Sequence, residues 1–394
     1  MYECELGKLK QLYKSGLFSK EYYSNRIDGD RSFSSYEEFK KIPLMDKQSI
    51  RDTTVFERTN TTLNDVYGIF SSSGTTGNKT FYIYNKNDKT VHEEFVKTFF
   101  KELDITSSDI GGVMAPVGTG VMAHTMLWEF NTVGAGYINC PEPSPQNMLD
   151  IIENVPVSVI ATRPNVASSI AGFPELVQKA RTSTVKKLAV GGGFLSKERR
   201  KLIEHVWNAE CFNCFGMSEM FGPMAAECRE KNGLHYLNEY LMIELLDPIT
   251  KEPVEDGKPG IAVYTTLWEK GFPLLRYWTD DLMKLDFSVC KCGSTHPKLY
   301  YLGRLADCFL IDNEYVFPEQ VEDILFKNGF FGDYKVIYNE EKYTIFTECE
   351  GYRDIHILTN EIKKLFHERN IQISLVPLGS LNYKGFGTRF ENKK

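Results

Sequence analysis

Residues 71–80 have the sequence SSSGTTGNKT, which combines three serines, three threonines, two glycines and one lysine. Such a run offers unhindered backbone N–H groups and several hydroxyl donors, which suit a polyphosphate. A flexible surface linker is the alternative for an isolated Ser/Gly-rich segment, but the strand-forming stretches VYGIF and FYIY flank this one and indicate a hairpin. The spacing of Gly74 and Gly77 differs from that of the common P-loop. The stretch therefore predicts a different kind of loop, one that binds the phosphates of ATP.

The chain around this loop has the alternating pattern of an α/β protein. From about residue 65 to residue 265, short apolar stretches alternate with amphipathic ones, and residues 233–285 are rich in strand-forming residues. We expect residues 1–304 to form a large N-terminal domain of mixed sheets flanked by helices, with a β-rich segment. Residues 305–394 combine helix-like and strand-like stretches and are expected to form a small α+β C-terminal domain.

The composition limits the classes of function. Of the 394 residues, 42% are apolar and 25% are charged, which is typical of a globular protein. The net charge of −7 disfavours nucleic acid and anionic membranes as partners, because both attract positive surfaces. No apolar run approaches the roughly 20 residues of a membrane-spanning helix. The start MYECELGKLK lacks the apolar core of a signal peptide, so we expect a cytoplasmic protein that acts on small molecules.

Four further motifs follow in order: GGGFLS at 191–196, CFGMSEM at 214–220, YWTDDL at 277–282 and LGRLADCFL at 302–310. Together with SSSGTTGNKT they resemble the adenylate-forming superfamily of acyl-CoA synthetases, luciferases and peptide-synthetase adenylation domains. IPLMDKQSIR and CKCGSTHPKLYYLGR resemble its phenylacetate–CoA ligase branch. The resemblance implies an ATP- and Mg²⁺-dependent ligase that converts a carboxylic acid into an acyl-adenylate, releases pyrophosphate and passes the acyl group to coenzyme A. It also implies that the small C-terminal domain is mobile.

The resemblance implies a role for each motif residue, in a reaction that requires charge neutralisation and the alignment of two reactants. Thr75, Thr76 and Lys79 would grip phosphate oxygens. Glu219 would hold Mg²⁺, and Lys384 would bridge the carboxylate and the phosphate. Further matched residues would contact the nucleotide through backbone groups, ring stacking and ribose hydrogen bonds. They are Ser72, Ser73, Gly74, Gly77, Gly191, Gly192, Phe215, Gly216, Ser218, Asp281 and Arg304.

The chain departs from the family pattern at several places. Gly193 replaces an acidic residue, Ala306 stands at the hinge position, and Lys384 matches only with a gap. One alternative is therefore an adenylating enzyme that passes the acyl group to a carrier-protein phosphopantetheine or to an amine. Another is a degenerate nucleotide-binding protein without turnover. The intact SGTTG motif, together with Glu219 and Asp281, favours an enzyme over the second alternative.

The acid-binding pocket is expected in the segment APVGTGVMAHTMLWEF, residues 115–130. Small residues with Met122, His124 and Trp128 could line an apolar slot, which suits an aromatic or small hydrophobic acid. For His124 alone, a packed core histidine is the favoured interpretation. The expected partners are a small carboxylic acid and, for the carrier alternative, an acyl-carrier protein, and the enzyme would be a monomer or a homodimer.

The chain has nine cysteines without a disulfide pattern, so metal binding or core packing is expected of them. Cys228, His235, Cys290 and Cys292 form a candidate structural zinc set, because thiolates and an imidazole suit tetrahedral zinc. The patterns CxxxxGLH and CxCGxxHP also occur in members of the phenylacetate–CoA ligase branch, and His296 is a substitute ligand. Four unrelated side chains are the alternative. Cys211 and Cys214 are expected to pack in a buried strand.

Overall fold

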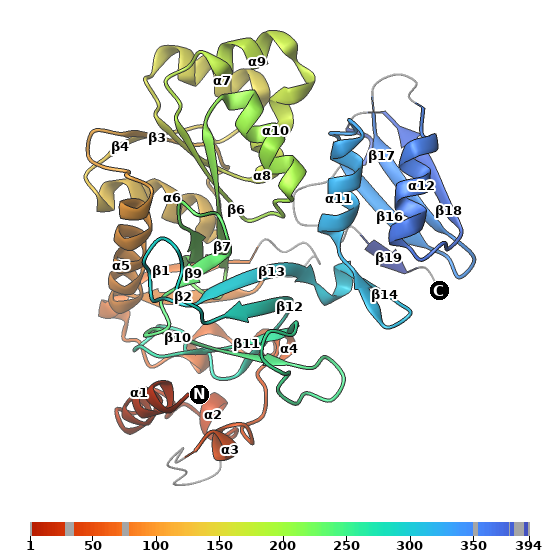
Figure 1. Cartoon of the computed structure of the whole chain (residues 1–394). Helices are drawn as coiled ribbons and strands as arrows, with labels where there is room; N and C mark the ends of the chain where they lie inside the picture. The colour runs from red at the N-terminus through yellow and green to blue at the C-terminus, as the bar shows by residue number, and fades with distance from the viewer. Residues whose placement is uncertain are drawn as a thin grey trace. The chain divides into compact units, whose positions relative to one another are not determined.

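The computed structural model describes residues 2–27, 35–72, 79–349, 354–377, 379–381 and 390–392 (Figure 1). The chain divides into two compact units, each built from separate stretches of sequence. The first unit comprises Met1–Ser108, Val117–Ala135 and Cys214–Tyr301. The second unit comprises Asp109–Pro116, Gly136–Asn213 and Leu302–Lys394. The domain boundary expected after residue 304 stays a prediction.

The first unit begins with short helices. They are α1 (Glu3–Lys14), α2 (Glu21–Ser24), α3 (Tyr36–Phe39) and α4 (Lys47–Arg51), followed by the 3₁₀ helices η1 (Val55–Arg58) and η2 (Leu63–Asp65). Asp46 caps α4, because its carboxylate accepts a hydrogen bond of 2.7 Å from the Ser49 backbone N–H. The apolar faces of these helices, including Leu9 and Phe39, are buried in the core of this unit.

A hairpin follows in the first unit and confirms the strands expected on either side of the glycine-rich loop. Strands β1 (Val66–Ser71) and β2 (Phe81–Asn85) pair in antiparallel fashion, with Ser71 opposite Phe81. Helix α5 (Lys86–Glu102) follows β2 directly and is capped by Asn85. Helix α6 (Val121–Thr132) completes this part of the unit. The loop residues 73–78 lie outside the described residues.

The β-rich segment, most of which lies in the first unit, is also confirmed. Its strands follow the order β10-β11-β12-β13-β9-β8-β7 within one sheet. Their bounds are β7 (Glu210–Met217), β8 (Gly222–Glu227), β9 (Leu234–Tyr236), β10 (Leu241–Leu246), β11 (Gly260–Thr266), β12 (Tyr277–Asp286) and β13 (Lys298–Arg304). Every residue of β11 is buried, which fits its position between two neighbouring strands.

The second unit contains a parallel sheet with the order β6-β5-β3-β4. Its elements are β3 (Ile110–Val113), β4 (Gly136–Asn139), β5 (Val159–Thr162), β6 (Lys187–Gly191), α7 (Pro145–Asn154), α8 (Pro164–Ser168), η3 (Ser169–Gly172), α9 (Pro174–Arg181) and α10 (Lys197–Trp207). Strand β5 is buried at all four positions, as expected for a strand covered on both faces. The predicted α/β class is therefore confirmed.

The C-terminal part of the second unit has its own sheet and hydrophobic cluster. The sheet has the order β18-β17-β16-β19, and α11 and α12 pack against it. The elements are η4 (Leu305–Asp307), β14 (Phe309–Ile311), β15 (Glu314–Val316), α11 (Pro318–Lys327), β16 (Tyr334–Tyr338), β17 (Tyr343–Glu348), α12 (His356–Leu365), β18 (Ile371–Val376) and β19 (Phe390–Asn392). This confirms the α+β character expected of the C-terminal segment, whereas its mobility stays a prediction.

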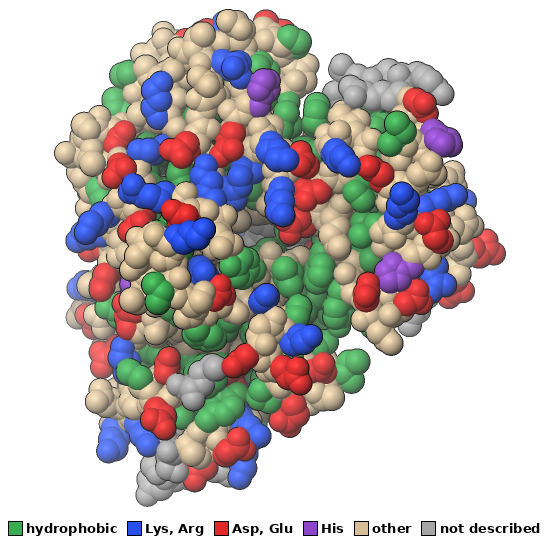
Figure 2. All heavy atoms as spheres, in the orientation of Figure 1, with side chains coloured by type: hydrophobic (Ala, Val, Ile, Leu, Met, Phe, Trp, Pro, Cys, Tyr) green, Lys and Arg blue, Asp and Glu red, His purple; other side chains and the backbone are tan. Residues whose placement is uncertain are grey.

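The described surface carries charges of both signs. On the face shown in Figure 2, Lys and Arg side chains are interspersed with Asp and Glu side chains. Among the helices that the structure describes, none combines the length and the apolar character needed to span a bilayer.

Candidate active site

Two of the sequence motifs and the strand that follows the glycine-rich loop meet at Glu219 in the first unit. Glu219 follows β7, is only 5% exposed, and its Oε1 accepts hydrogen bonds of 3.0 Å from two tyrosine hydroxyls. Tyr82 comes from β2, directly after the glycine-rich loop, and Tyr277 opens β12 in the YWTDDL motif. The strand after the loop, the FGMSE turn and the YWTDDL strand thus share one buried carboxylate.

The turn that carries Glu219 depends on a close approach between β7 and β8. A Cβ at Gly216 would lie 2.4 Å from the Gly222 carbonyl oxygen, so only glycine fits there. The Tyr84 hydroxyl, on the same face of β2 as Tyr82, donates a hydrogen bond to the Ser218 carbonyl. These contacts fix the backbone on both sides of Glu219.

The two tyrosines that contact Glu219 are permanent donors at ordinary pH. Burial raises the pKa of Tyr82 far above its ordinary value, and the Glu219 carboxylate raises it further. The same two causes raise the pKa of Tyr277. Both hydroxyls therefore keep their protons and orient one oxygen of Glu219. The sequence motifs did not single out either tyrosine, and only the alternation of side chains along β2 could have suggested Tyr82.

A second buried acid, Asp88, lies near this site at the start of α5. Its Oδ1 accepts a hydrogen bond of 2.9 Å from Trp268 Nε1, and its Oδ2 accepts one of 2.9 Å from the Gly271 backbone N–H. Lys270 is buried, with Nζ 3.6 Å from Asp88 Oδ1 and 4.6 Å from the centre of the Tyr84 ring. Burial lowers the pKa of Lys270, and the Asp88 carboxylate opposes that shift. Sequence reasoning missed this pair, because WEKGF has the composition of a surface turn.

The ends of the glycine-rich loop are held by specific hydrogen bonds. The Ser72 backbone N–H donates to the Thr80 carbonyl at 2.8 Å, and the Ser72 Oγ accepts from the Thr80 N–H at 3.1 Å. Lys79 Nζ donates to Thr119 Oγ1 at 3.0 Å, and Ser71 Oγ donates to the same oxygen at 2.8 Å. Thr119, which the motifs did not identify, thus contacts both ends of the loop.

Several predicted phosphate-binding residues cannot be placed. They lie outside the described residues and are Ser73, Gly74, Thr75, Thr76, Gly77 and the C-terminal Lys384.

The other predicted nucleotide-binding residues fall in both units. In the first unit, the Phe215 ring lies 5.1 Å from that of Tyr301, and Asp281 is buried in β12. In the second unit, Gly191 ends β6 and Gly192 has a φ of +67°, a conformation that favours glycine. Arg304, also in the second unit, is exposed at the end of β13. Their roles stay predictions.

The residues expected to line an acid pocket lie on α6 among aromatic side chains. His124 is half-buried and Nε2 lies 2.9 Å from the Gly118 carbonyl oxygen, so it is not a fully packed core histidine. Trp128 stacks on His92, whose ring centre is 5.4 Å away. The buried His92 Nε2 lies 3.1 Å from Glu129 Oε1. Met122, on the same helix, is half-buried.

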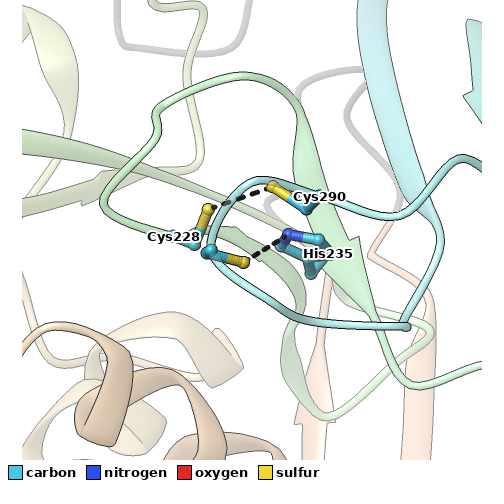
Figure 3. Close-up of side chains that lie close together, drawn as sticks. Cys228, His235 and Cys290 are labelled. Atoms are coloured by element: carbon cyan, nitrogen blue, oxygen red, sulfur yellow. Dashed lines mark hydrogen bonds between the residues drawn. The ribbon is translucent and has the colours of Figure 1, made fainter.

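The predicted metal-binding residues converge in the first unit, as Figure 3 shows for Cys228, His235 and Cys290. The ligand atoms of Cys228, His235, Cys290 and Cys292 all lie within 4.8 Å of one another. The two sulfur atoms of Cys228 and Cys290 are 3.8 Å apart, and Cys292 Sγ lies 3.6 Å from His235 Nε2. The four side chains that the sequence analysis grouped therefore lie together, and their role in metal binding stays a prediction. Strand pairing produces this proximity, because Ala226 of β8 and Lys298 of β13 both pair with His235 of β9.

Contacts around the cluster orient its members. His235 Nδ1 lies 2.8 Å from the His296 carbonyl oxygen, which directs Nε2 to the three sulfur atoms. The Ser294 N–H donates to Cys292 Sγ at 3.4 Å. Burial lowers the pKa of His235, so the imidazole is neutral and able to act as a ligand. The His296 ring lies 3.6 Å from Glu239 and is not part of the cluster.

The sequence of this chain matches a known protein family and is similar to proteins of known activity. The model of the family described as AMP-binding enzyme matches residues 25–265. A phenylacetate-coenzyme A ligase of Thermus thermophilus is 30% identical over 302 residues, which cover 75% of this chain and 67% of that protein. The Escherichia coli phenylacetate-coenzyme A ligase is 25% identical over 81% of this chain and 74% of its own length.

Solved structures share the fold. The structure of 2-hydroxyisobutyryl-CoA ligase in the postadenylation state, in complex with 2-HIB-AMP, superimposes with a TM-score of 0.85 and 18% identity, over 99% of this chain and 89% of that one. The anthranilate CoA ligase AuaEII in complex with anthranoyl-AMP has a TM-score of 0.63 over 79% of this chain and 62% of its own, with 15% identity.

Proposed function

Because this chain belongs to the AMP-binding enzyme family, in its phenylacetate-coenzyme A ligase branch, and is an adenylate-forming acid–CoA ligase, we propose that its substrate is an aromatic or small hydrophobic carboxylic acid. The half-buried Trp128 and Met122 of α6 and the aromatic side chains around them support an apolar acid. We further propose that the enzyme acts in the cytoplasm, where ATP, coenzyme A and reduced cysteines such as the nine free thiols here are found.

The proposed reaction has two steps. A carboxylate oxygen of the acid attacks the α-phosphorus of ATP, the bond to the β-phosphate breaks, and pyrophosphate leaves. The thiol of coenzyme A then loses its proton and attacks the acyl carbon, the bond to the phosphate oxygen breaks, and AMP leaves. Lys79 and the threonines of the loop would neutralise phosphate charge, and Asp281 would accept the ribose hydroxyls. Lys384 would bridge the two reactants in the first step.

The arrangement around Glu219 is the observation that carries this proposal. Mg²⁺ prefers oxygen ligands, and a carboxylate next to the ends of the phosphate loop suits it. Oε1 is held by Tyr82 and Tyr277, whereas Oε2 accepts no hydrogen bond from any residue that the structure describes. Glu219 would therefore hold Mg²⁺ through Oε2, and the cation would neutralise phosphate charge during the attack.

Pyrophosphate release from ATP tests the reaction. The full chain is assayed with phenylacetate, benzoate, 2-hydroxyisobutyrate, acetate and decanoate, with and without coenzyme A, and thioesters are identified by mass spectrometry. We expect the highest rates with an aromatic or short acid and a CoA thioester as the product. Release without any CoA thioester would favour a carrier-protein or amine acceptor, and no release with any acid would favour a nucleotide-binding protein.

We also propose that the cluster of Cys228, His235, Cys290 and Cys292 binds a structural Zn²⁺. Zinc–sulfur bonds of about 2.3 Å in a tetrahedron place two sulfur atoms about 3.8 Å apart. The sulfur atoms of Cys228 and Cys290 have that separation, 3.8 Å. Three thiolates and one imidazole complete a closed tetrahedral set with no open position for chemistry, which supports a structural role.

Metal analysis of the purified protein tests the zinc site. The unmodified chain should carry about one zinc per molecule, and the variant with Cys290→Ser and Cys292→Ser should carry almost none. Cys140→Ser is the matched control, because Cys140 is buried and lies outside the cluster. Full zinc retention in the double variant would contradict the proposal.

A further inference from the structure

We infer that Tyr82 and Tyr277 are positioning residues that fix Glu219 so that a single oxygen, Oε2, is presented to the metal–ATP complex. The inference deepens the proposed function and rests on it. Neither tyrosine belongs to the motif residues assigned above, and neither would touch the metal or the substrate. Their role is to hold the Glu219 carboxylate, which would contact the metal.

The hydrogen bonds around Glu219 divide its two oxygens into different roles. Tyr82 Oη and Tyr277 Oη each lie 3.0 Å from Oε1. A carboxylate oxygen has two lone pairs, so two donors saturate Oε1. No Lys, Arg or His nitrogen among the described residues lies within 4.0 Å of a Glu219 oxygen, although the buried Lys270 ammonium attracts the carboxylate from farther away, and Oε2 remains the oxygen with capacity to bind a cation.

The two hydroxyls are held by rigid elements. Tyr82 is fully buried and lies opposite Phe70 in the β1–β2 hairpin. Tyr277 is 2% exposed and lies opposite Tyr264 of β11. The backbone next to Tyr277 is fixed on the other side by Met45, whose N–H donates to the Arg276 carbonyl at 2.9 Å. The donors cannot rotate away from Glu219 without moving these strands.

The use of neutral donors also follows from the chemistry of the site. A lysine or arginine paired with Glu219 would neutralise the carboxylate and weaken its attraction for a cation. A tyrosine hydroxyl orients the carboxylate and leaves its full negative charge. Residues that orient a metal ligand in this way typically contribute 10- to 100-fold to metal affinity or activity.

Substitutions that remove one hydroxyl and keep the ring test the inference. The variants are Tyr82→Phe, Tyr277→Phe and both together, in the full chain. The matched control is Tyr264→Phe, because Tyr264 is equally buried, pairs with Tyr277 across the strands, and donates its hydroxyl to Met283 Sδ and not to Glu219. Circular dichroism and thermal unfolding establish that each variant is folded.

The first measurement does not depend on turnover. Binding of ATP is measured by calorimetry with Mn²⁺ and, separately, with EDTA. We expect each tyrosine variant to lose about 10-fold in affinity for Mn²⁺–ATP and the double variant about 100-fold, with little change for metal-free ATP. Tyr264→Phe should match the unmodified protein in both.

The second measurement is pyrophosphate release as a function of Mg²⁺ concentration, with ATP saturating. The concentration of Mg²⁺ at half-maximal rate should rise in both tyrosine variants, whereas the KM for the acid should not change. Unchanged Mn²⁺–ATP affinity in both tyrosine variants, with Glu219→Gln losing it, would overturn the inference alone. Unchanged Mn²⁺–ATP affinity in Glu219→Gln would overturn the metal role of Glu219 in the proposed function, and the inference with it.

Discussion

Glu219 and Glu322, two of the buried glutamates, differ in how their charge is satisfied. Glu322 of α11 is fully buried, and each of its oxygens accepts a hydrogen bond of 2.9 Å from the guanidinium of Arg199 on α10. Arg199 also donates to Ser168 Oγ at 2.8 Å and lies over the Phe326 ring. Glu219 accepts its hydrogen bonds from the neutral hydroxyls of two tyrosines, and the nearest cation that acts on it, Lys270, is paired with Asp88. A fully paired acid of this kind stabilises the fold, whereas a buried acid held by neutral donors retains charge for a ligand.

Removing the charge of Glu219 should have the largest effect, and the effect should be on activity. In Glu219→Gln, one oxygen is replaced by an amide that is a poor metal ligand, so we expect pyrophosphate release to fall about 1000-fold, or ~4 kcal/mol. The free energy of unfolding should change by about 1 kcal/mol or less, because the tyrosine hydroxyls still have an acceptor. Steady-state kinetics and urea denaturation measure the two quantities. Activity within about threefold of the unmodified enzyme would contradict the comparison.

Removing the carboxylate of Glu322 should affect stability instead. Glu322→Ala leaves the buried Arg199 guanidinium without its partner, which typically costs about 3–5 kcal/mol. The control is Glu361→Ala, which removes a partly exposed partner of Lys327 at 3.0 Å and should cost less than about 1 kcal/mol. Urea denaturation measures the loss in the free energy of unfolding for both variants. Equal losses would show that burial of an ion pair does not determine how much its removal costs.

A third acid, Glu319 on α11, extends the comparison to the pH dependence of folding stability. We expect its effect to be smaller than those of Glu219 and Glu322. Burial raises its pKa to about 7, and the neighbouring Asp323 contributes. Since the folded pKa is above the unfolded value of about 4.3, the folded state binds the proton more tightly between those values. The stabilisation that protonated Glu319 provides is fully present below about pH 4.3 and is lost as the pH rises through about 7.

Replacement of Glu319 should remove this dependence. We expect Glu319→Gln to be more stable than the unmodified chain by about 1 kcal/mol at pH 8, after allowance for the partial exposure of the side chain, and nearly unchanged at pH 4. Thermal unfolding at the two pH values measures the difference. An equal gain in stability at both pH values would mean that protonation of Glu319 does not cause the effect.

The candidate residues of the site could be recognised in the sequence because they belong to ordered motifs, and their roles stay predictions. Glu219, Asp281 and the glycine-rich loop follow from short stretches whose order along the chain is specific. The convergence of the cysteines and His235 followed from spacing, because short pairings between β8, β9 and β13 bring them together. The α/β class followed from the alternation of apolar and amphipathic stretches.

The remaining features depend on contacts between distant segments, which no local pattern contains. Tyr82 and Glu219 are separated by 137 positions and meet only through packing. Lys270 lies in a turn of polar composition, and its burial against Asp88 requires the whole unit. Both units are built from separate stretches, so a division of the chain into consecutive domains could not anticipate them.

The hydroxyl pair on Oε1 of Glu219 has a consequence for ion selectivity. An acid with one oxygen already saturated offers only one ligand atom to a cation. Ca²⁺ takes six to eight oxygen ligands and often binds a carboxylate through both oxygens, whereas Mg²⁺ keeps several waters and accepts one oxygen per acid. The two tyrosines would therefore discriminate between the two commonest divalent cations of the cell without touching either.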